Sequence, residues 1–308
     1  MRILVLGAGG VGGYFGGRLV EKGEDVTFLV RSGRKKQLKE KGLVIRSVNG
    51  DFQFSPKLIT KTDEAEAFDL VLFSTKAYHL EEAINDLQAF IGEKTVVLPL
   101  LNGIAHLPAL KQAFGEDKVI GGLCFIETTL NKEGDVVQTS AAARIVYGEI
   151  GSQQTERIRR MEEAFSGAKA DFLLSDHIEQ EMWHKYLFIS VMSGATTLMR
   201  APIGPIRESS GGRSFIRQLF EEAAQIMRAY GAPIQENIVD EHMKTIDAID
   251  YEMKSSMQRD MEKGFFIEGD HLQGYLLELA KNTSSNAQLL SVVYQNLKVY
   301  IKMLEYNK

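Results

Sequence analysis

The sequence has one cysteine, Cys124, among 308 residues. A single cysteine excludes an intrachain disulfide and a zinc site built from cysteines, and it is typical of a reducing compartment, so we expect a cytoplasmic protein. No apolar run reaches the roughly 18 residues that a membrane-spanning helix requires. Residues 1–6, which are apolar except for Arg2, run directly into glycines, which favours a buried strand over a signal peptide.

The sequence also lacks an excess of positive charge. Its formal net charge is −5, so no nucleic-acid or anionic-membrane partner is predicted. The histidines are scattered without a pair four residues apart, and no metal site is predicted. A chain of this length exceeds what one hydrophobic core usually serves, which favours two domains.

The first half of the chain alternates short apolar runs with helical stretches. The predicted strands cover residues 3–6, 25–30, 69–74 and 95–100, and the helices between them cover 11–22, 34–41 and a stretch ending near residue 90. Buried strands that alternate with helices predict a parallel sheet covered on both faces. Between residues 121 and 150, β-prone pieces broken by residues 131–135 predict a hairpin at the edge of this sheet.

The second half is predicted to be helical. Helices are expected over residues 157–166, after the N-cap pair Ser175-Asp176, up to Gly231, and over 241–262 and 271–281. The sequence therefore predicts an α/β protein with a doubly wound sheet in residues 1–174 and an all-helical domain in residues 175–308.

A glycine-rich loop follows the first strand. The pattern G-x-G-x-x-G is formed by Gly7, Ala8, Gly9, Gly10, Val11 and Gly12. In a Rossmann-type dinucleotide site Gly7 would allow the tight turn, Gly9 would let the backbone approach a pyrophosphate, and Gly12 would let the helix pack on the strand. The alternative is a glycine turn that binds no ligand.

No carboxylate closes the second strand, where an acidic side chain would bind the ribose hydroxyls of NAD. Arg31 stands there instead, followed by Ser32 and Arg34. A guanidinium can stack on adenine and hold a 2′-phosphate through its planar fork, so the pattern favours NADP. The alternative is that these residues only begin a solvated basic helix.

Several further motifs, in this order, resemble the ketopantoate reductase (2-dehydropantoate 2-reductase) family over nearly the whole chain. They are Ser74-Thr75-Lys76-Ala77, Leu101-Asn102-Gly103, Trp183-His184-Lys185, Ser255-Ser256-Met257 with Asp260, and Glu268 with Asp270.

The resemblance implies a role for each matching position. Lys76 and Asn102 would lie by the nicotinamide of NADP, Lys185 would be the general acid, Ser256 would bind the substrate carboxylate, and Glu268 would hydrogen-bond near the reacting oxygen and Lys185. An ammonium there would stabilise the negative charge that grows on the ketone oxygen and would supply its proton. Without the resemblance, Lys185 would be one of many helix lysines.

Four positions depart from the family pattern, which has mostly asparagine there. They are Ile189, Ser193, Ile203 and Met253. Three of these are apolar, and lost partners for a substrate hydroxyl cost about 1–3 kcal/mol each, which favours a less hydroxylated substrate than ketopantoate. The alternative is that loops supply replacement donors and ketopantoate is still used.

The sequence thus predicts an NADPH-dependent reductase of a 2-oxo acid, with pantothenate biosynthesis as the pathway that the resemblance implies. Two alternatives stay open, a reductase of a more apolar 2-oxo acid and a non-catalytic NADP(H)-binding sensor. A homodimer is one possible assembly.

Overall fold

The computed structural model describes residues 1–151 and 154–306. Contacts between Cα atoms divide the chain into two compact units. The first unit contains Met1–Leu101 and His106–Glu179, and the second contains Asn102–Ala105 and Gln180–Lys308. The short segment Asn102–Ala105 therefore belongs to the second unit, although it follows a strand of the first.

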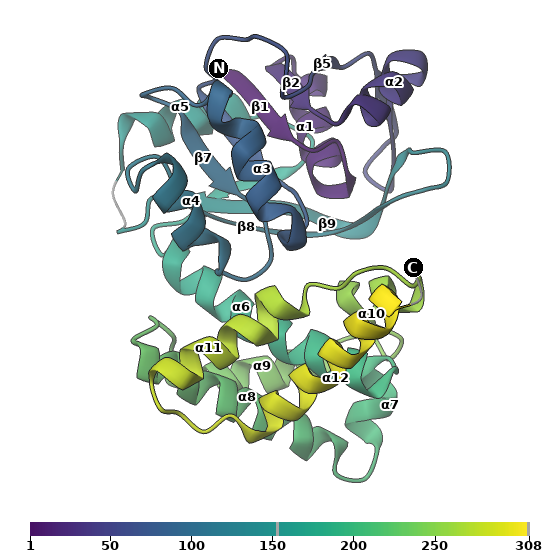
Figure 1. The fold of residues 1–308 in the computed structure, drawn as a ribbon, viewed down its shortest axis with the longest axis vertical. Helices are drawn as coiled ribbons and strands as arrows, with labels where there is room; N and C mark the ends of the chain where they lie inside the picture. Colours follow the sequence, from purple (N-terminus) through teal and green to yellow (C-terminus); the bar gives the residue numbers. More distant parts are fainter. Residues whose placement is uncertain (152–153, 307–308) are drawn as a thin grey trace. The chain divides into compact units, whose positions relative to one another are not determined.

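Five strands of the first unit form a parallel sheet in the order β5-β2-β1-β6-β7 (Figure 1). The strands are β1 (Arg2–Leu6), β2 (Asp25–Leu29), β5 (Lys57–Ile59), β6 (Leu70–Phe73) and β7 (Val96–Pro99). All of β1 after Arg2, and all of β6 and β7, is buried, as the apolar runs predict. Because β2 and β6 flank β1, the loops that follow these three strands emerge at one edge of the sheet.

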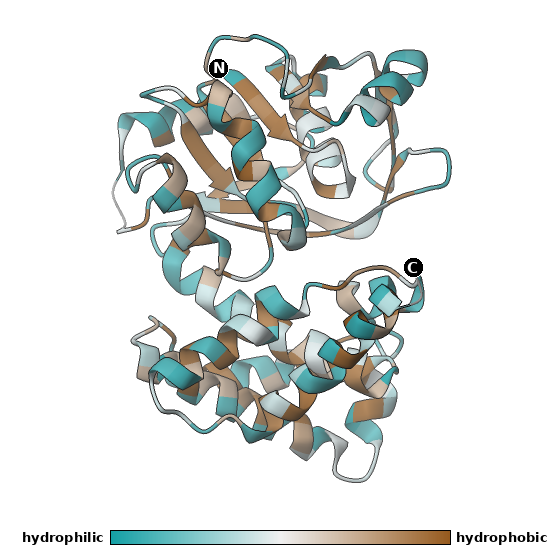
Figure 2. Cartoon of the chain, viewed as in Figure 1, coloured by the Kyte–Doolittle hydropathy of each residue, from teal (hydrophilic) through white to brown (hydrophobic). Residues whose placement is uncertain are grey.

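Side chains of β1 alternate between two hydrophobic cores. Ile3 and Val5 join a core with α1 (Gly10–Lys22), whereas Leu4 and Leu6 join one with α3 (Leu80–Leu87) and α4 (His106–Phe114). The sheet is thus covered on both faces, and Figure 2 shows its apolar strands between helices with polar outer faces. The remaining helical pieces here are α2 (Ser32–Lys41), η1 (Ala77–His79) and η2 (Gln88–Phe90).

A second sheet was not expected from the sequence. Its order is β10-β9-β3-β4, with β8 paired to β9, and its strands are β3 (Leu43–Ser47), β4 (Phe52–Phe54), β8 (Gly121–Leu130), β9 (Val136–Gly148) and β10 (Asp171–Leu174). The predicted hairpin exists as the antiparallel pair β8 and β9, but its predicted place at the edge of the parallel sheet is wrong. It pairs with β3 and β10 because its apolar face packs, with α5 (Glu156–Phe165), against α1.

The second unit is helical throughout its regular structure (Figure 1). Its helices are α6 (Ile178–Met199), α7 (Ile203–Glu208), α8 (Gly212–Tyr230), α9 (Ile238–Ala248), α10 (Ser256–Glu262), the π-helical turn η3 (Asp270–Gly274), α11 (Tyr275–Asn282) and α12 (Gln288–Tyr306). The apolar face of α8 is buried and contacts α7, α9, α11 and α12. The predicted fold class, a Rossmann-type domain followed by a helical domain, is confirmed.

Two predicted helices differ in detail from the observed ones. The stretch 241–262 is two helices, because residues 249–255 leave the helix and Ser255 caps α10 by accepting a hydrogen bond from Gln258 N. The stretch 271–281 begins with the π-helical turn η3. Among the described residues, no helix is long and apolar enough to cross a bilayer.

Candidate active site

The glycine loop has the geometry that its pattern predicts. Gly7 has a φ of +92°, a conformation that favours glycine, and α1 begins three residues later at Gly10. A Cβ added at Gly12 would lie 2.2 Å from Gly7 O and 2.2 Å from Ser74 Oγ, so only glycine lets α1 approach the strands this closely. A Cβ at Gly9 would meet no atom within 4 Å. The backbone at Gly9 is therefore open to a ligand at the N-terminus of α1.

The loops that follow β1 and β6 are tied together at this edge. Ser74 Oγ donates a hydrogen bond to Leu6 O at 2.9 Å. Lys76, which comes two residues later, is half-buried and caps η1 in the same unit. The residues just before Lys76 lie against the glycine loop, since a Cβ added at Gly7 would lie 3.9 Å from Ser74 O and 4.0 Å from Thr75 Cγ2.

Arg34 supports the glycine loop from the α2 side. Its Nη2 donates to Ala8 O at 3.0 Å and to Gly134 O at 2.9 Å, and burial lowers the pKa of the guanidinium while Asp135 opposes the shift. The Arg34 guanidinium is therefore engaged by hydrogen bonds to backbone carbonyl groups. Arg31, by contrast, is exposed at the start of α2 and pairs with Glu82 and His79 on the other side of the loop.

The second unit brings Lys185 and Asn102 together. Lys185 Nζ lies 3.2 Å from Asn102 Oδ1 and donates a hydrogen bond to it, although 83 residues separate the two. Lys185 lies on α6 and is partly buried, and Asn102 begins the short segment that joins this unit. An amide oxygen at this distance fixes the direction of the ammonium group.

His271 is a member of this group that the sequence did not single out. Its partly buried ring has a lowered pKa, because burial disfavours the charged form; the nearby Glu268 carboxylate and a hydrogen bond with the Asn102 backbone oppose the shift. A Cβ on Gly103 would come within 3.4 Å of the ring. Both Glu268 and His271 flank the start of η3, a kind of turn that is frequent at functional sites. The spacing of three residues from Glu268 was the available signal.

The positions predicted to bind substrate lie in different environments. Ile189 and Met253 are partly exposed and Ser256 is exposed, but Ile203 is fully buried and its N–H donates to Met253 O at 3.0 Å. Ser193 is buried and accepts a hydrogen bond from Gln273 Nε2 at 3.0 Å.

Ser255, which precedes Ser256, has a structural role. Besides capping α10, its Oγ lies 2.8 Å from Thr196 Oγ1, within hydrogen-bond distance. The hydroxyls of both Ser193 and Ser255 are thus engaged inside the helical unit. Ser256 itself is exposed.

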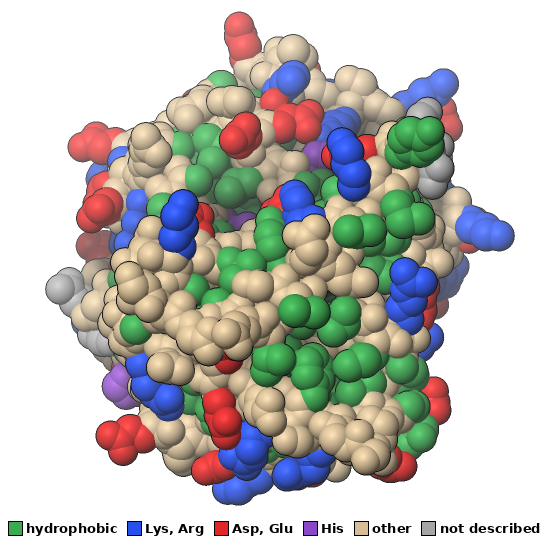
Figure 3. Space-filling view, turned by 60° about the horizontal axis from the view of Figure 1, so that its bottom comes forward, with side chains coloured by type: hydrophobic (Ala, Val, Ile, Leu, Met, Phe, Trp, Pro, Cys, Tyr) green, Lys and Arg blue, Asp and Glu red, His purple; other side chains and the backbone are tan. Residues whose placement is uncertain are grey.

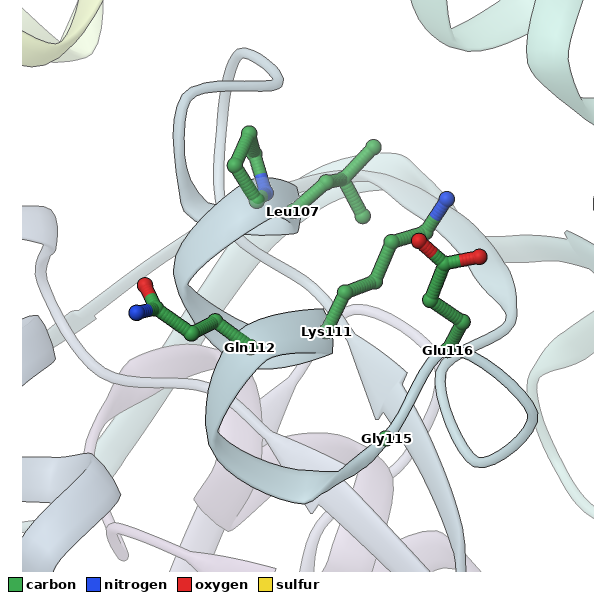
Figure 4. Close-up of a pocket in the computed structure, with 6 residues that line it drawn as sticks. Leu107, Lys111, Gln112, Gly115 and Glu116 are labelled. Carbon is green, nitrogen blue, oxygen red and sulfur yellow. The ribbon is translucent and has the colours of Figure 1, made fainter.

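A surface hollow of about 630 Å³ lies elsewhere, along α4 in the first unit (Figure 4). It is lined by Leu107, Pro108, Lys111, Gln112, Gly115 and Glu116. None of these is a predicted site residue. Among the described residues, no cluster of three or more His, Cys, Asp or Glu side chains is arranged to hold a metal.

Known proteins match the chain over nearly its whole length. The family model Ketopantoate reductase PanE/ApbA matches residues 3–152, and its C-terminal counterpart matches residues 177–301. A relative from Bacillus subtilis (strain 168), the uncharacterized oxidoreductase YkpB, is 49% identical over 97% of this chain and 99% of its own.

Solved structures agree with these matches. The 2-dehydropantoate 2-reductase from Geobacter metallireducens GS-15 has a TM-score of 0.87 and 28% identity, covering 97% of this chain and 99% of its own. A D-mandelate dehydrogenase, solved with NADH and anilino(oxo)acetate, has a TM-score of 0.89 at 20% identity, covering 99% and 100%. The fold and the matches define an oxidoreductase. The chain belongs to the ketopantoate reductase PanE/ApbA family, as the motifs indicate.

Proposed function

We propose that the protein is an NADPH-dependent reductase of a 2-oxo acid. The observation that chiefly supports this is the hydrogen bond of 3.2 Å between Lys185 Nζ and Asn102 Oδ1, beside His271 and Glu268. Reduction of a ketone needs a positioned proton donor, which a passive binding protein does not need.

The glycine loop fits a dinucleotide. The open space at Gly9, the positive φ of Gly7 and the free N–H groups at the start of α1 suit a pyrophosphate, and Arg31 stands where the adenosine ribose is bound in such folds. When bound, the nicotinamide cofactor supplies a hydride. In the proposal Lys76 and Asn102 lie by its nicotinamide end.

Lys185 has two tasks in the proposed reaction. Its ammonium stabilises the negative charge that develops on the carbonyl oxygen, and it donates the proton that converts the ketone to an alcohol. In the proposal Asn102 holds the ammonium in position and Glu268 binds the resulting hydroxyl. Ser256 is the proposed partner of the substrate carboxylate.

The substrate class has two candidates. The family assignment favours 2-dehydropantoate, which NADPH would reduce to pantoate in pantothenate biosynthesis. A more apolar 2-oxo acid is favoured by Ile189 and Met253, which are partly exposed, and by Ser193, whose hydroxyl is bound to Gln273. An apolar wall gains about 25 cal/mol per Å² of buried alkyl surface and nothing from a hydroxyl that must leave water unpaired.

Steady-state oxidation of NADPH with ketopantoate and with 2-oxoisovalerate tests this. We expect kcat/KM for 2-oxoisovalerate to approach or exceed that for ketopantoate. Met253→Asn should shift the ratio toward ketopantoate, whereas Met199→Asn, at an exposed methionine of α6, should leave it unchanged. A preference of the wild type for ketopantoate by a hundredfold or more would establish the plain family assignment.

The same assay distinguishes the sensor alternative. Tight binding of NADPH without oxidation by any 2-oxo acid would identify a cofactor-binding sensor.

The homodimer stays a prediction. Val292, Val299 and Met303 are exposed along one side of α12. Figure 3 shows apolar side chains gathered on one face. Sedimentation velocity measures whether two copies associate.

A further inference from the structure

The guanidinium of Arg31 already has an acidic partner within the protein. Its Nη2 forms an ion pair with Glu82 Oε2, and His79 Nδ1 lies 3.4 Å from the same nitrogen. Glu82 lies in the first turn of α3, 51 residues along the chain from Arg31. All three residues belong to the first unit.

The topology of the sheet places this ion pair across the glycine loop. Arg31 follows β2, and Glu82 follows β6, the strands that flank β1 on its two sides. The glycine loop follows β1 itself. A carboxylate therefore stands beside the end of β2, where NAD enzymes of this fold carry an acidic residue, although the sequence around β2 supplies none.

We propose that Glu82 is a cofactor-specificity residue, whose carboxylate occupies the Arg31 guanidinium that the 2′-phosphate of NADPH requires and so lowers the preference of the site for the phosphorylated cofactor. This inference rests on the proposed function. A 2′-phosphate must either displace Glu82 from Arg31 or lie beside a second negative group, and both cost binding free energy. The 2′-hydroxyl of NADH carries no charge and can donate a hydrogen bond to the same carboxylate.

The size of the effect follows from exposure. Arg31 and Glu82 are 62% and 46% exposed, so water and salt screen the pair and the phosphate can displace it. Removing the carboxylate should therefore tighten NADPH binding by about threefold to fivefold, the upper part of the range in which exposed charge pairs act. Binding of NADH should stay the same or weaken.

Dissociation constants for both cofactors, measured by fluorescence titration without substrate, test the proposal. The variant is Glu82→Gln, and the matched control is Glu81→Gln, which removes the same charge from the exposed neighbour in the same helix turn. We expect Glu82→Gln to raise the NADPH-to-NADH affinity ratio at least threefold above the ratio of Glu81→Gln. In an Arg31→Ala background the two variants should have equal ratios.

The outcomes separate this inference from the proposed function. If the wild type binds both cofactors but Glu82→Gln and Glu81→Gln change the ratio equally, Glu82 is not a specificity residue and only this inference is wrong. A gain that persists in the Arg31→Ala background would also overturn it, because the effect would not act through Arg31. If the wild type binds neither cofactor, both the proposed function and this inference are wrong.

Discussion

Alanine at Gly9 and alanine at Gly12 separate the ligand-binding role of the glycine loop from its packing role. Gly9 caps α1 with φ −87° and ψ −160°, a conformation that alanine adopts without strain, and its added methyl would meet no atom within 4 Å. At Gly12 the methyl would lie 2.2 Å from Gly7 O and Ser74 Oγ and 3.0 Å from Val5 Cγ1. The methyl of Gly9→Ala obstructs only a ligand, whereas the methyl of Gly12→Ala clashes with neighbouring atoms of the protein.

The expected magnitudes differ accordingly. Gly9→Ala should lower the free energy of unfolding by at most about 1 kcal/mol, the cost of a poorer N-cap. Its methyl would separate the backbone from a pyrophosphate, so we expect NADPH to bind at least tenfold more weakly, about 1.4 kcal/mol. Gly12→Ala gains about 1 kcal/mol of helix propensity, but overpacking against a backbone oxygen costs about 3 kcal/mol or more. We therefore expect a net loss of about 2 kcal/mol.

Thermal unfolding followed by circular dichroism gives the stability, and fluorescence titration gives the dissociation constant of NADPH. Gly33→Ala is the control, because a methyl there also meets no atom within 4 Å. Normal NADPH affinity in a stable Gly9→Ala variant would refute the assignment of the loop as the pyrophosphate site. Wild-type stability of Gly12→Ala would refute the packing argument.

Three further predictions concern the helical unit. Lys185→Ala should lower kcat by about a hundredfold or more while NADPH affinity is kept, since only the proton donor is lost; near-normal turnover would place the donor elsewhere. His271→Phe keeps a buried ring but loses the hydrogen bond with the Asn102 backbone, so kcat should fall about tenfold with little change in KM; an unchanged kcat would assign His271 to packing alone. Burial lowers the pKa of His242 from 6.5 to about 4. The unfolded chain thus binds a proton at His242 that the folded one excludes, so His242 should contribute about 2 kcal/mol to the loss of stability between pH 7 and pH 5. Urea unfolding of His242→Gln should show a loss that is smaller than that of the wild type by this amount.

The parallel sheet was predictable because its signals are local. Strands β1, β6 and β7 are short apolar runs that are buried on both faces. The turn of the glycine loop is determined by residues next to one another in the sequence, so the glycine pattern predicts it. The second sheet was not predictable in the same way. Strand β4 is only partly buried, and in β10 exposed residues alternate with partly buried ones, so neither strand forms a clear apolar run in the sequence. The register of β9 with β3 pairs residues that are about 90 positions apart.

The residues of the candidate site differ in how much local signal each one carries in the sequence. A lysine on a helix carries no signal of its own, and Lys185 was predicted only from the family motif; its hydrogen bond to Asn102 joins residues that tertiary folding alone brings together. His271 was missed for the same reason. Its environment consists of Glu268 on its own turn and of a segment from another part of the chain.

The preference for NADP or NAD cannot be predicted from the missing carboxylate after β2 alone. The lack of an acid after β2 favours NADP only if no other element brings a carboxylate to that place, and a sequence pattern cannot test that condition. Glu82 meets Arg31 from the helix after β6, because β2 and β6 flank β1 and their following loops share one edge of the sheet. Specificity at this edge is therefore a property of two loops together. A substitution in α3 should change cofactor preference as surely as one at Arg31.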